Sequence, residues 1–355
     1  MQYRWLGASG LKVSAFTLGT MGFGGASAGG WVATIDEREA REQVRVALDA
    51  GVNLFDTANG YSKGDSERLL GSALGSERDR VLVSTKVHVR VGDGPNDVGQ
   101  SRWHVLRACD DSLRRLGTDR IDIYHLHGVD ACTPIDETLR ALDDLVRAGK
   151  VRYVACSNFA AWQIMKPLGV AERRNLERFV ATQAYYSLVA RDLENEVLPL
   201  CADQGLGLLV WSPLAGGFLS GKFTSDMTPA AGTRRGQIGD LGVGHIDTER
   251  GHTIVDVARA IASARGVSVA QVALNWLRTR HEVSSVIIGA RTTEQLADNL
   301  AAATWHLDAD EAARLDTVSE PVRPYPTWYQ RQFTAERFHR NGAPDGAFNY
   351  RFGDD

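Results

Sequence analysis

Four polar residues of different chemical types stand at the ends of short apolar runs or just beyond them. Asp56 ends VNLFD, Lys86 ends VLVSTK, His127 ends IYHLH, and Tyr61 lies five residues past Asp56 in the loop DTANGYSKGDSE. A free tyrosine has a pKa of about 10, too high for an efficient proton donor near neutrality. A neighbouring ammonium would stabilise the phenolate and lower that pKa. The sequence therefore predicts proton donation by Tyr61, tuned by Lys86, with Asp56 as the counter-charge of the lysine.

Other polar residues occupy equivalent places. Ser157 and Asn158 follow YVAC, Gln183 follows FVAT, and Trp211 ends LGLLVW. Taken singly, each is more often a solvated loop residue. Their shared place favours a common site, because the carboxyl ends of parallel strands meet at one rim of an α/β barrel.

The elements that must position these residues alternate along the chain. Eight apolar runs predict strands, each followed by a helix-like segment: FTLGT, VNLFD, RVLVSTK, IDIYHLH, VRYVACS, FVATQA, LGLLVW and SSVIIG. The runs are apolar almost throughout, as expected of parallel strands covered on both faces. Eight such repeats close into a barrel more naturally than they form an open sheet. The predicted fold class is therefore α/β, a single (β/α)8 barrel.

We expect one domain over residues 1–355. Residues 1–15 are predicted to form a β-hairpin that turns at residues 8–10 and caps the lower end of the barrel. The connection from residue 213 to about 250, between the seventh and eighth strands, has the length of a lid or an insert. Residues 321–355 are rich in aromatic side chains and are expected to pack on the barrel as a C-terminal tail.

From LGASGLKVSAFTLGTMGFG to GARTTEQLADNL the chain resembles the aldo-keto reductase superfamily, in its long-chain branch of bacterial enzymes and potassium-channel β subunits. FDTANGYSKGDSE is similar to the first signature of that family, STK carries its lysine and IDIYHLHGVD its histidine. The resemblance implies a catalytic tetrad of Asp56, Tyr61, Lys86 and His127. It also implies nicotinamide contacts from Ser157, Asn158, Gln183 and, stacked on the ring, Trp211.

A phosphate site is predicted after the last strand. Thr292 and Gln295 have the spacing of a capping box, and the N-terminus of a helix attracts phosphate. Arg291 offers a planar donor suited to the 2′-phosphate of NADP, and Lys222 resembles the family lysine that reaches the pyrophosphate. NADPH is thus the expected cofactor. By the same resemblance, Gln295, Asp298 and Asn299 match positions that contact the adenosine part of the cofactor. Further cofactor contacts are expected from Gly19, Thr20, Met21, Ser212, Pro213, Leu214, Gly216 and Gly289.

Two other patterns are discounted. GFGGASAGG resembles a dinucleotide-binding fingerprint, but its third glycine would fall on Ser27 and no helix follows directly. His125 and His127 share one face of a strand, but no third ligand stands at a suitable spacing, so no metal is expected. We expect His125 to pack in the interior.

Composition excludes several classes of protein. The 40 basic and 44 acidic side chains give a net charge of −4 without a basic stripe, so nucleic acid is not an expected partner. No apolar run approaches a membrane span, and no secretory leader is visible, which favours a cytoplasmic protein. A reducing compartment also fits the four cysteines, which form no CxxC pair: Cys109, Cys132, Cys156 and Cys201.

The predicted reaction is the reduction of a small carbonyl substrate. Hydride would pass from the nicotinamide to the carbonyl carbon, Tyr61 would protonate the oxygen, and His127 would orient that oxygen. Aldehydes, cyclic ketones and keto-sugars are all left open, as is the oligomeric state. The substrate pocket is expected to include Phe23, Trp31, His88, the segment 89–102, the long connection after the seventh strand and the aromatic tail.

Two other functions fit parts of the pattern. An aldolase would use Lys86 as a Schiff-base nucleophile, which leaves Tyr61 and Trp211 without a role. A cofactor-sensing regulatory subunit with little turnover would keep an intact tetrad, so the sequence leaves it open.

Overall fold

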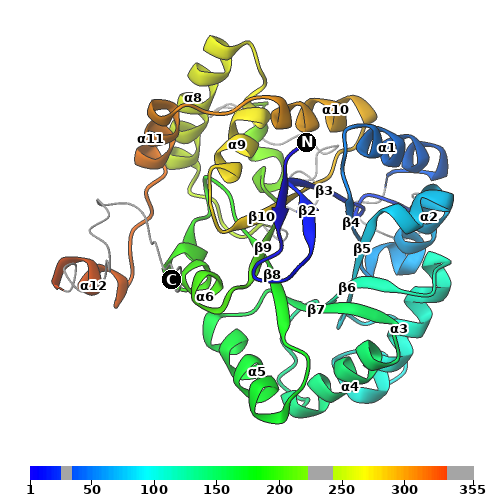
Figure 1. Cartoon of the computed structure of the whole chain (residues 1–355). Coiled ribbons are helices and arrows are strands. Elements are labelled where there is room, and N and C mark those ends of the chain that lie inside the picture. The colour runs from blue at the N-terminus through cyan, green and yellow to red at the C-terminus, as the bar shows by residue number, and fades with distance from the viewer. Residues whose placement is uncertain (25–33, 223–242, 334–355) are drawn as a thin grey trace.

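The computed structural model describes residues 1–24, 34–222 and 243–333. Eight parallel strands close into a barrel (Figure 1). In order around the ring they are β3 (Phe16–Gly19), β4 (Leu54–Asp56), β5 (Leu82–Val87), β6 (Ile121–Leu126), β7 (Val151–Ser157), β8 (Phe179–Tyr185), β9 (Gly207–Trp211) and β10 (Val283–Ile288). Because β10 pairs with β3, the ring has no free edge. The predicted (β/α)8 barrel is confirmed.

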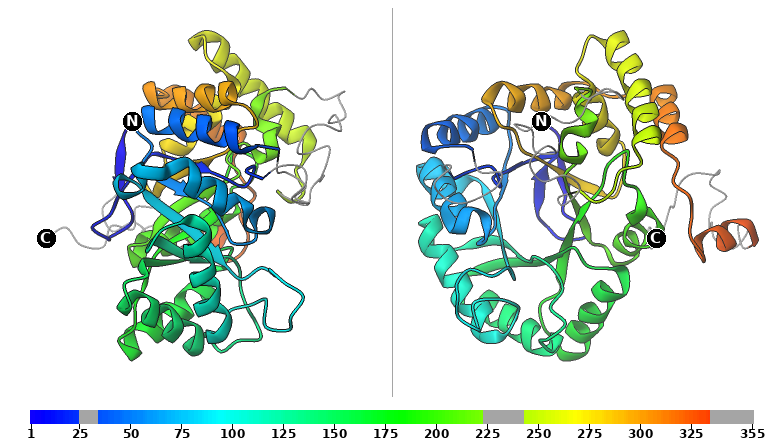
Figure 2. Two further views of the ribbon diagram at one scale, coloured as in Figure 1. Left: turned by 90° about the vertical axis from the view of Figure 1, so that its right-hand side faces the viewer. Right: turned by 180° about the vertical axis from the view of Figure 1, so that it is seen from behind.

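Helices surround the ring of strands, as Figures 1 and 2 show from three sides. They are α1 (Glu37–Asp49), α2 (Asp65–Leu74), α3 (Arg102–Leu116), α4 (Ile135–Arg147), α5 (Ala161–Arg174), α6 (Val197–Gln204), α8 (Thr248–Arg265), α9 (Val269–Arg278), α10 (Thr293–Ala301) and α11 (Ala309–Val318). The last helix, α12 (Thr327–Phe333), stands apart from the barrel. Local signals set many of their ends. The side chains of Asp36 and Ser101 cap the first turns of α1 and α3, and α3 ends at Gly117 with a φ of 64°.

The barrel interior is filled in layers. A lower layer of small and branched side chains comes from six strands: Leu54, Ile123, Ala155, Ala181, Leu209 and Ile287. Side chains alternate along a strand, so the residue two positions further on also faces inward. On five of these strands that residue is polar or aromatic: Asp56, His125, Ser157, Gln183 and Trp211. Strand periodicity thus places the predicted site directly above an apolar floor.

The N-terminal hairpin closes the opposite end of the barrel. β1 (Tyr3–Trp5) pairs antiparallel with β2 (Lys12–Ser14), and Figure 1 shows the pair lying across the barrel. Leu6 and Val13 are fully buried against the lower layer of the interior. Arg4 donates to three carbonyl oxygens at the end of α9 and the start of β10, those of Arg278 (2.6 Å), Arg280 (3.3 Å) and Val283 (2.7 Å), and so ties the hairpin to them. The predicted hairpin is confirmed.

The structure describes part of the predicted long connection and part of the predicted tail. The connection between β9 and β10 holds the 3-10 helix η5 (Ala215–Ser220), α8 and α9, while residues 223–242 lie outside the described part. In the tail, residues 324–327 line one hollow together with the loops after β7 and β8. Four aromatic side chains are instead exposed and pack on one another: Tyr325, Trp328, Tyr329 and Phe333. In the described ranges, no helix is long and apolar enough to cross a membrane.

Candidate active site

Lys86 lies at the centre of a polar cluster at the carboxyl ends of β4 and β5. Its ammonium is fully buried and donates to Asp56 Oδ2 at 2.6 Å and to the carbonyl of Thr57 at 2.7 Å. A third, longer contact of 3.4 Å reaches the hydroxyl of Tyr61. The structure therefore brings together the carboxylate, ammonium and phenol expected from the sequence.

Asp56 is held by three donors. Its second oxygen, Oδ1, accepts from Ser84 Oγ at 2.5 Å and from Gln183 Nε2 at 3.0 Å. Burial alone would raise the pKa of Asp56, but the charge of Lys86 and these hydrogen bonds hold it below its usual value. Burial likewise works to lower the pKa of Lys86, and the Asp56 carboxylate outweighs it and raises that pKa. The pair is therefore ionised near neutrality.

His127 lies beside Tyr61 with its ring edge-on, the centroids 5.7 Å apart. Burial, reinforced by the charge of Lys86, lowers the pKa of His127 to about 3, so the imidazole is neutral. Its Nδ1 is buried without a hydrogen-bond partner in the described ranges. A buried orphan N–H is rarer than an orphan acceptor, so the tautomer with its proton on Nε2 is favoured. His125, one layer below, is also neutral, since burial lowers its pKa to about 4.

Strained backbone surrounds the cluster. Among described non-glycine residues, seven have a positive φ, and all but Asn175, which ends α5, lie in loops after β4, β5, β7 or β9: Ser62, Lys63, His88, Asn158, Ser212 and Ala215. Left-handed backbone costs about 1 kcal/mol or more per residue and concentrates at functional sites. No pattern in the sequence marks these positions, yet they lie on the rim that carries the predicted site.

The predicted nicotinamide residues form one network. Asn158 Nδ2 donates to the carbonyl of His127 at 2.9 Å and to Ser157 Oγ at 3.0 Å. Trp211 Nε1 donates to Asn158 Oδ1 at 3.1 Å, and the indole stacks on Tyr185 at 4.9 Å between centroids. Sequence reasoning missed Tyr185, although it lies two positions beyond Gln183 on the same strand face.

The predicted phosphate site gathers positive charge at the start of α10. The side chain of Thr292 caps the helix by accepting from the Gln295 N–H at 3.3 Å. The expected capping box is incomplete, because Gln295 Oε1 accepts from the N–H of Arg291 rather than from that of Thr292. Burial and the charge of Arg291 lower the pKa of Lys222. Two cations that repel one another in this way favour an anion between them.

The remaining predicted residues are distributed as follows. Thr20 donates through Oγ1 to the carbonyl of Asp56 at 3.1 Å. Gly19 and Gly289 adjoin across β3 and β10, and a Cβ on Gly19 would lie 2.7 Å from the side chain of Ile287. The other members surround these groups: Met21 follows β3, Ser212, Pro213 and Leu214 follow β9, and Gly216 takes a φ of 65° in η5.

Several predicted residues have other partners. The Asp298 carboxylate accepts from Ser268 Oγ and Gln271 Nε2 and so joins α10 to α9, beside the buried Asn299. Among the expected substrate residues, Phe23 is buried in the core, His88 is half-buried beside Gln100, and Trp31 lies outside the described residues. No group of three or more potential metal ligands occurs in residues 1–24, 34–222 and 243–333.

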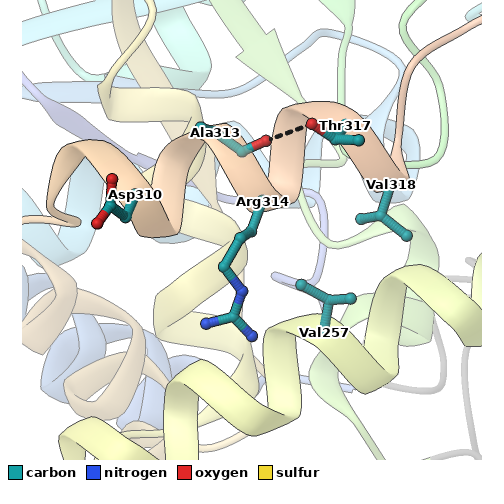
Figure 3. A pocket seen from close by; sticks show the side chains of 6 residues that line it. All are labelled: Val257, Asp310, Ala313, Arg314, Thr317 and Val318. Carbon is teal, nitrogen blue, oxygen red and sulfur yellow. Dashed lines mark hydrogen bonds between the residues drawn. The ribbon is translucent and has the colours of Figure 1, made fainter.

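Two hollows in the described residues are large enough to hold a small molecule. One of about 450 Å³ is lined by Asn158 and Tyr185 of the rim, by the first residues of α5 and α6, and by residues 324–327 of the tail. The other, of about 620 Å³, lies between α8 and α11, where Arg314 extends beside Val257 (Figure 3). It contains none of the predicted catalytic or cofactor residues. The first hollow is therefore the one that adjoins the candidate site.

Comparison with known proteins agrees with this geometry. The Aldo/keto reductase family matches residues 16–320. The chain is 38% identical to the uncharacterized oxidoreductase YrpG of Bacillus subtilis, over 90% of this chain and 96% of that one. It is 35% identical to versiconal hemiacetal acetate reductase of Aspergillus parasiticus, over 92% and 99%. It is 37% identical to a probable voltage-gated potassium channel subunit beta of Oryza sativa, over 85% and 91%.

The match covers all eight barrel strands, and the relatives that are named as reductases or oxidoreductases support carbonyl reduction in general. The chain belongs to the aldo/keto reductase family.

Proposed function

We propose that this protein is an NADPH-dependent reductase that converts an aldehyde or a ketone to an alcohol, with Tyr61 as the general acid. The observation that carries the proposal is the placement of one buried ammonium between two groups. Lys86 Nζ lies 2.6 Å from the Asp56 carboxylate and 3.4 Å from the Tyr61 hydroxyl. An ammonium in this position favours the phenolate and so lowers the cost of proton transfer from tyrosine.

Four side chains have separate roles in the proton transfer that accompanies hydride transfer. A bound dihydronicotinamide supplies the hydride. Tyr61 gives its proton to the oxygen on which negative charge develops, while Lys86 stabilises the phenolate left behind. Neutral His127 presents a donor on Nε2 to the same oxygen. Asp56 keeps the lysine charged and in place, so that it acts as an electrostatic support and not as a nucleophile.

Three features support NADPH as the cofactor. Arg291 and Lys222 place two cations at the N-terminus of α10, which itself favours an anion. The rim residues Ser157, Asn158 and Gln183 offer amide and hydroxyl groups suited to a carboxamide. Trp211 presents a large aromatic surface beside them, with one face packed on Tyr185.

Replacement of Tyr61 by Phe tests the proposal directly. We expect kcat for carbonyl reduction to fall by about 10²-fold or more, since the donor is lost, while the affinity for NADPH changes little. Turnover is followed by nicotinamide absorbance with a panel of aldehydes, ketones and sugars, and affinity by fluorescence titration. Unchanged turnover in the Phe variant would remove Tyr61 from the mechanism.

A second function, cofactor sensing without rapid turnover, is favoured by the similarity to potassium-channel β subunits. Absent or very slow turnover across the carbonyl panel, combined with intact NADPH binding and a stable partner, would support it. The aldolase alternative is disfavoured, because the raised pKa of Lys86 keeps its amine protonated and non-nucleophilic. Borohydride trapping of a carbonyl compound on Lys86 would restore it.

A further inference from the structure

A second buried carboxylate lies on the outer side of the barrel wall. Glu67, in the first turn of α2, is fully buried. Its Oε1 accepts from Thr85 Oγ1 of β5 at 2.6 Å, and its Oε2 accepts from Arg115 Nε of α3 at 2.6 Å. A buried carboxylate is tolerated only with such partners, so these bonds join α2, β5 and α3 firmly.

Thr85, the strand residue that binds Glu67, is adjacent in sequence to Lys86 of the candidate site. Thr85 directly precedes Lys86, and neighbouring side chains of a strand point to opposite faces. Lys86 therefore faces the interior, where it meets Tyr61, while Thr85 faces outward, where it meets Glu67. The chain from Tyr61 to Glu67 crosses the rim between these two contacts.

The segment that crosses the rim is short and held at several points. Ser62 Oγ donates to the carbonyl of Phe23 at 2.8 Å, and Ser66 Oγ donates to that of Thr20 at 2.7 Å. Gly64 has a φ of 93°, and a Cβ there would lie 2.6 Å from Cδ of Arg115. The arginine that binds Glu67 thus also packs against the loop that carries Tyr61.

The charges around Glu67 are simple. Arg115 is its ion-pair partner in the described ranges, with a side chain 19% exposed. Tyr124 and Cys109 are the nearby titratable groups. Burial raises the pKa of both, that of Cys109 to about 12, so neither carries charge near neutrality. Among the residues that the structure describes, Arg115 is therefore the charged partner that Glu67 contacts.

We propose that Glu67 is a positioning residue that, through Thr85 and Arg115, sets how closely the Tyr61 hydroxyl approaches the Lys86 ammonium. The effect of Glu67 on catalysis rests on the proposed reductase function. Its effect on the distance between the Tyr61 hydroxyl and the Lys86 ammonium does not rest on that function. The 3.4 Å contact is long, so small displacements of the loop matter. A displacement of about 1 Å would weaken the Coulomb attraction by roughly a quarter.

Three threonine variants separate positioning from general stability. Thr85→Val removes the hydroxyl that binds Glu67 at nearly constant volume, and Thr85→Ser keeps it. Thr182→Val is the matched control, because Thr182 is equally buried and directly precedes Gln183 on β8, away from the Tyr61 loop.

The first measurement is the titration of the Tyr61 phenol without cofactor. Tyrosinate absorbance is recorded against pH, and the curve of the same protein carrying Tyr61→Phe is subtracted. Thr85→Val should raise the Tyr61 midpoint by about one pH unit, because the ammonium stabilises the phenolate less. Thr85→Ser and Thr182→Val should keep the wild-type midpoint. A wild-type midpoint in Thr85→Val, or an equal rise in Thr182→Val, overturns the proposal.

The second measurement is carbonyl reduction. Thr85→Val should lower kcat about tenfold with little change in NADPH affinity, and Thr85→Ser should restore it. If the wild-type protein reduces no carbonyl, the proposed function fails, and the phenol titration still decides the role of Glu67. If Thr85→Val does not fold, Arg115→Lys replaces it, because that side chain is partly exposed. An unchanged phenol titration in Arg115→Lys then overturns the proposal.

Discussion

Asp56 is the residue on which the charge balance of the candidate site depends. It accepts hydrogen bonds from three side chains, and it keeps a fully buried ammonium ionised. Removal of one partner from a buried ion pair leaves the other charge uncompensated. The carboxylate therefore supports the fold as well as the proposed chemistry.

Asp56→Asn is accordingly expected to lower the free energy of unfolding by about 3 kcal/mol at pH 7, measured by urea denaturation. In the variant, burial lowers the pKa of Lys86 without the opposing charge of Asp56. The unfolded state therefore binds more protons than the folded state as the pH approaches 10, and part of the lost stability returns. Ser84→Ala, which removes only one hydrogen bond to Asp56, should cost about 1 kcal/mol. Equal losses in the two variants would contradict this account.

Strand-end polar residues were predictable individually, whereas their partners were not. Asp56, Lys86 and His127 stand where apolar runs end, and that placement alone marked them. The bonds from Ser84 and Gln183 to Asp56 depend on the register between strands that lie far apart in the sequence. A single sequence does not contain that register, so these contacts required the structure.

At the scale of elements, β6 carries two histidines that are neutral in the folded protein. Burial lowers the pKa of His125 to about 4 and that of His127 to about 3, both below the usual value for histidine. When the pKa of a group is lower in the folded state than in the unfolded state, the unfolded chain binds more protons than the folded one at pH values between the two pKa values. Each histidine therefore contributes stability above about pH 6.5 that is lost as the pH falls toward its folded pKa.

The variant His125→Gln should make the protein less sensitive to acid. Between pH 7.5 and pH 5 the wild-type protein should lose about 2 kcal/mol more unfolding free energy than the variant, because one protonation on unfolding is removed. Denaturant unfolding at the two pH values measures this difference. The same loss in both proteins would show that His125 is protonated when folded.

The N-terminus of α10 offers a separate test of cofactor choice. Arg291→Leu should weaken NADPH binding by about tenfold to a hundredfold and leave NADH binding nearly unchanged, because the guanidinium is expected to contact only the 2′-phosphate. Arg291→Lys, which keeps the charge without the planar fork, should fall between the two. Fluorescence titrations with both nucleotides give the affinities. Equal weakening for NADH and NADPH would refute this role.

The barrel strands could be predicted from the sequence, whereas the buried helix α9 could not. The eight strands were identified because apolar runs alternated with amphipathic segments. By contrast, α9 was not identified as a helix. Its polar residues Gln271, Asn275 and Arg278 are buried and form internal hydrogen bonds, so they do not mark a face that is exposed to solvent. The tail was predicted wrongly in the opposite sense. Its aromatic composition predicted buried side chains, whereas the described ones are exposed.

At the scale of the molecule, the hairpin is part of the barrel core. Leu6 is fully buried beneath the lower layer of the interior, so Leu6→Ala should cost about 3 kcal/mol of unfolding free energy. Leu11 is only partly buried against the same cluster, so Leu11→Ala serves as the control and should lower the unfolding free energy by about 1 kcal/mol or less. We propose that the chain is one domain, and circular dichroism and tryptophan fluorescence should therefore report a single coincident transition.

Closure of the ring makes the order of events during synthesis unusual. Residues 16–18 of β3 pair with residues 286–288 of β10. This pairing joins the first barrel strand of the chain to the last. While the ribosome makes the chain, β3 must remain without its second neighbour until nearly the whole protein has emerged. The partial sheet meanwhile exposes backbone groups that can pair with other molecules. The nascent chain is therefore most vulnerable to aggregation just before β10 is released, and the finished barrel has no such edge.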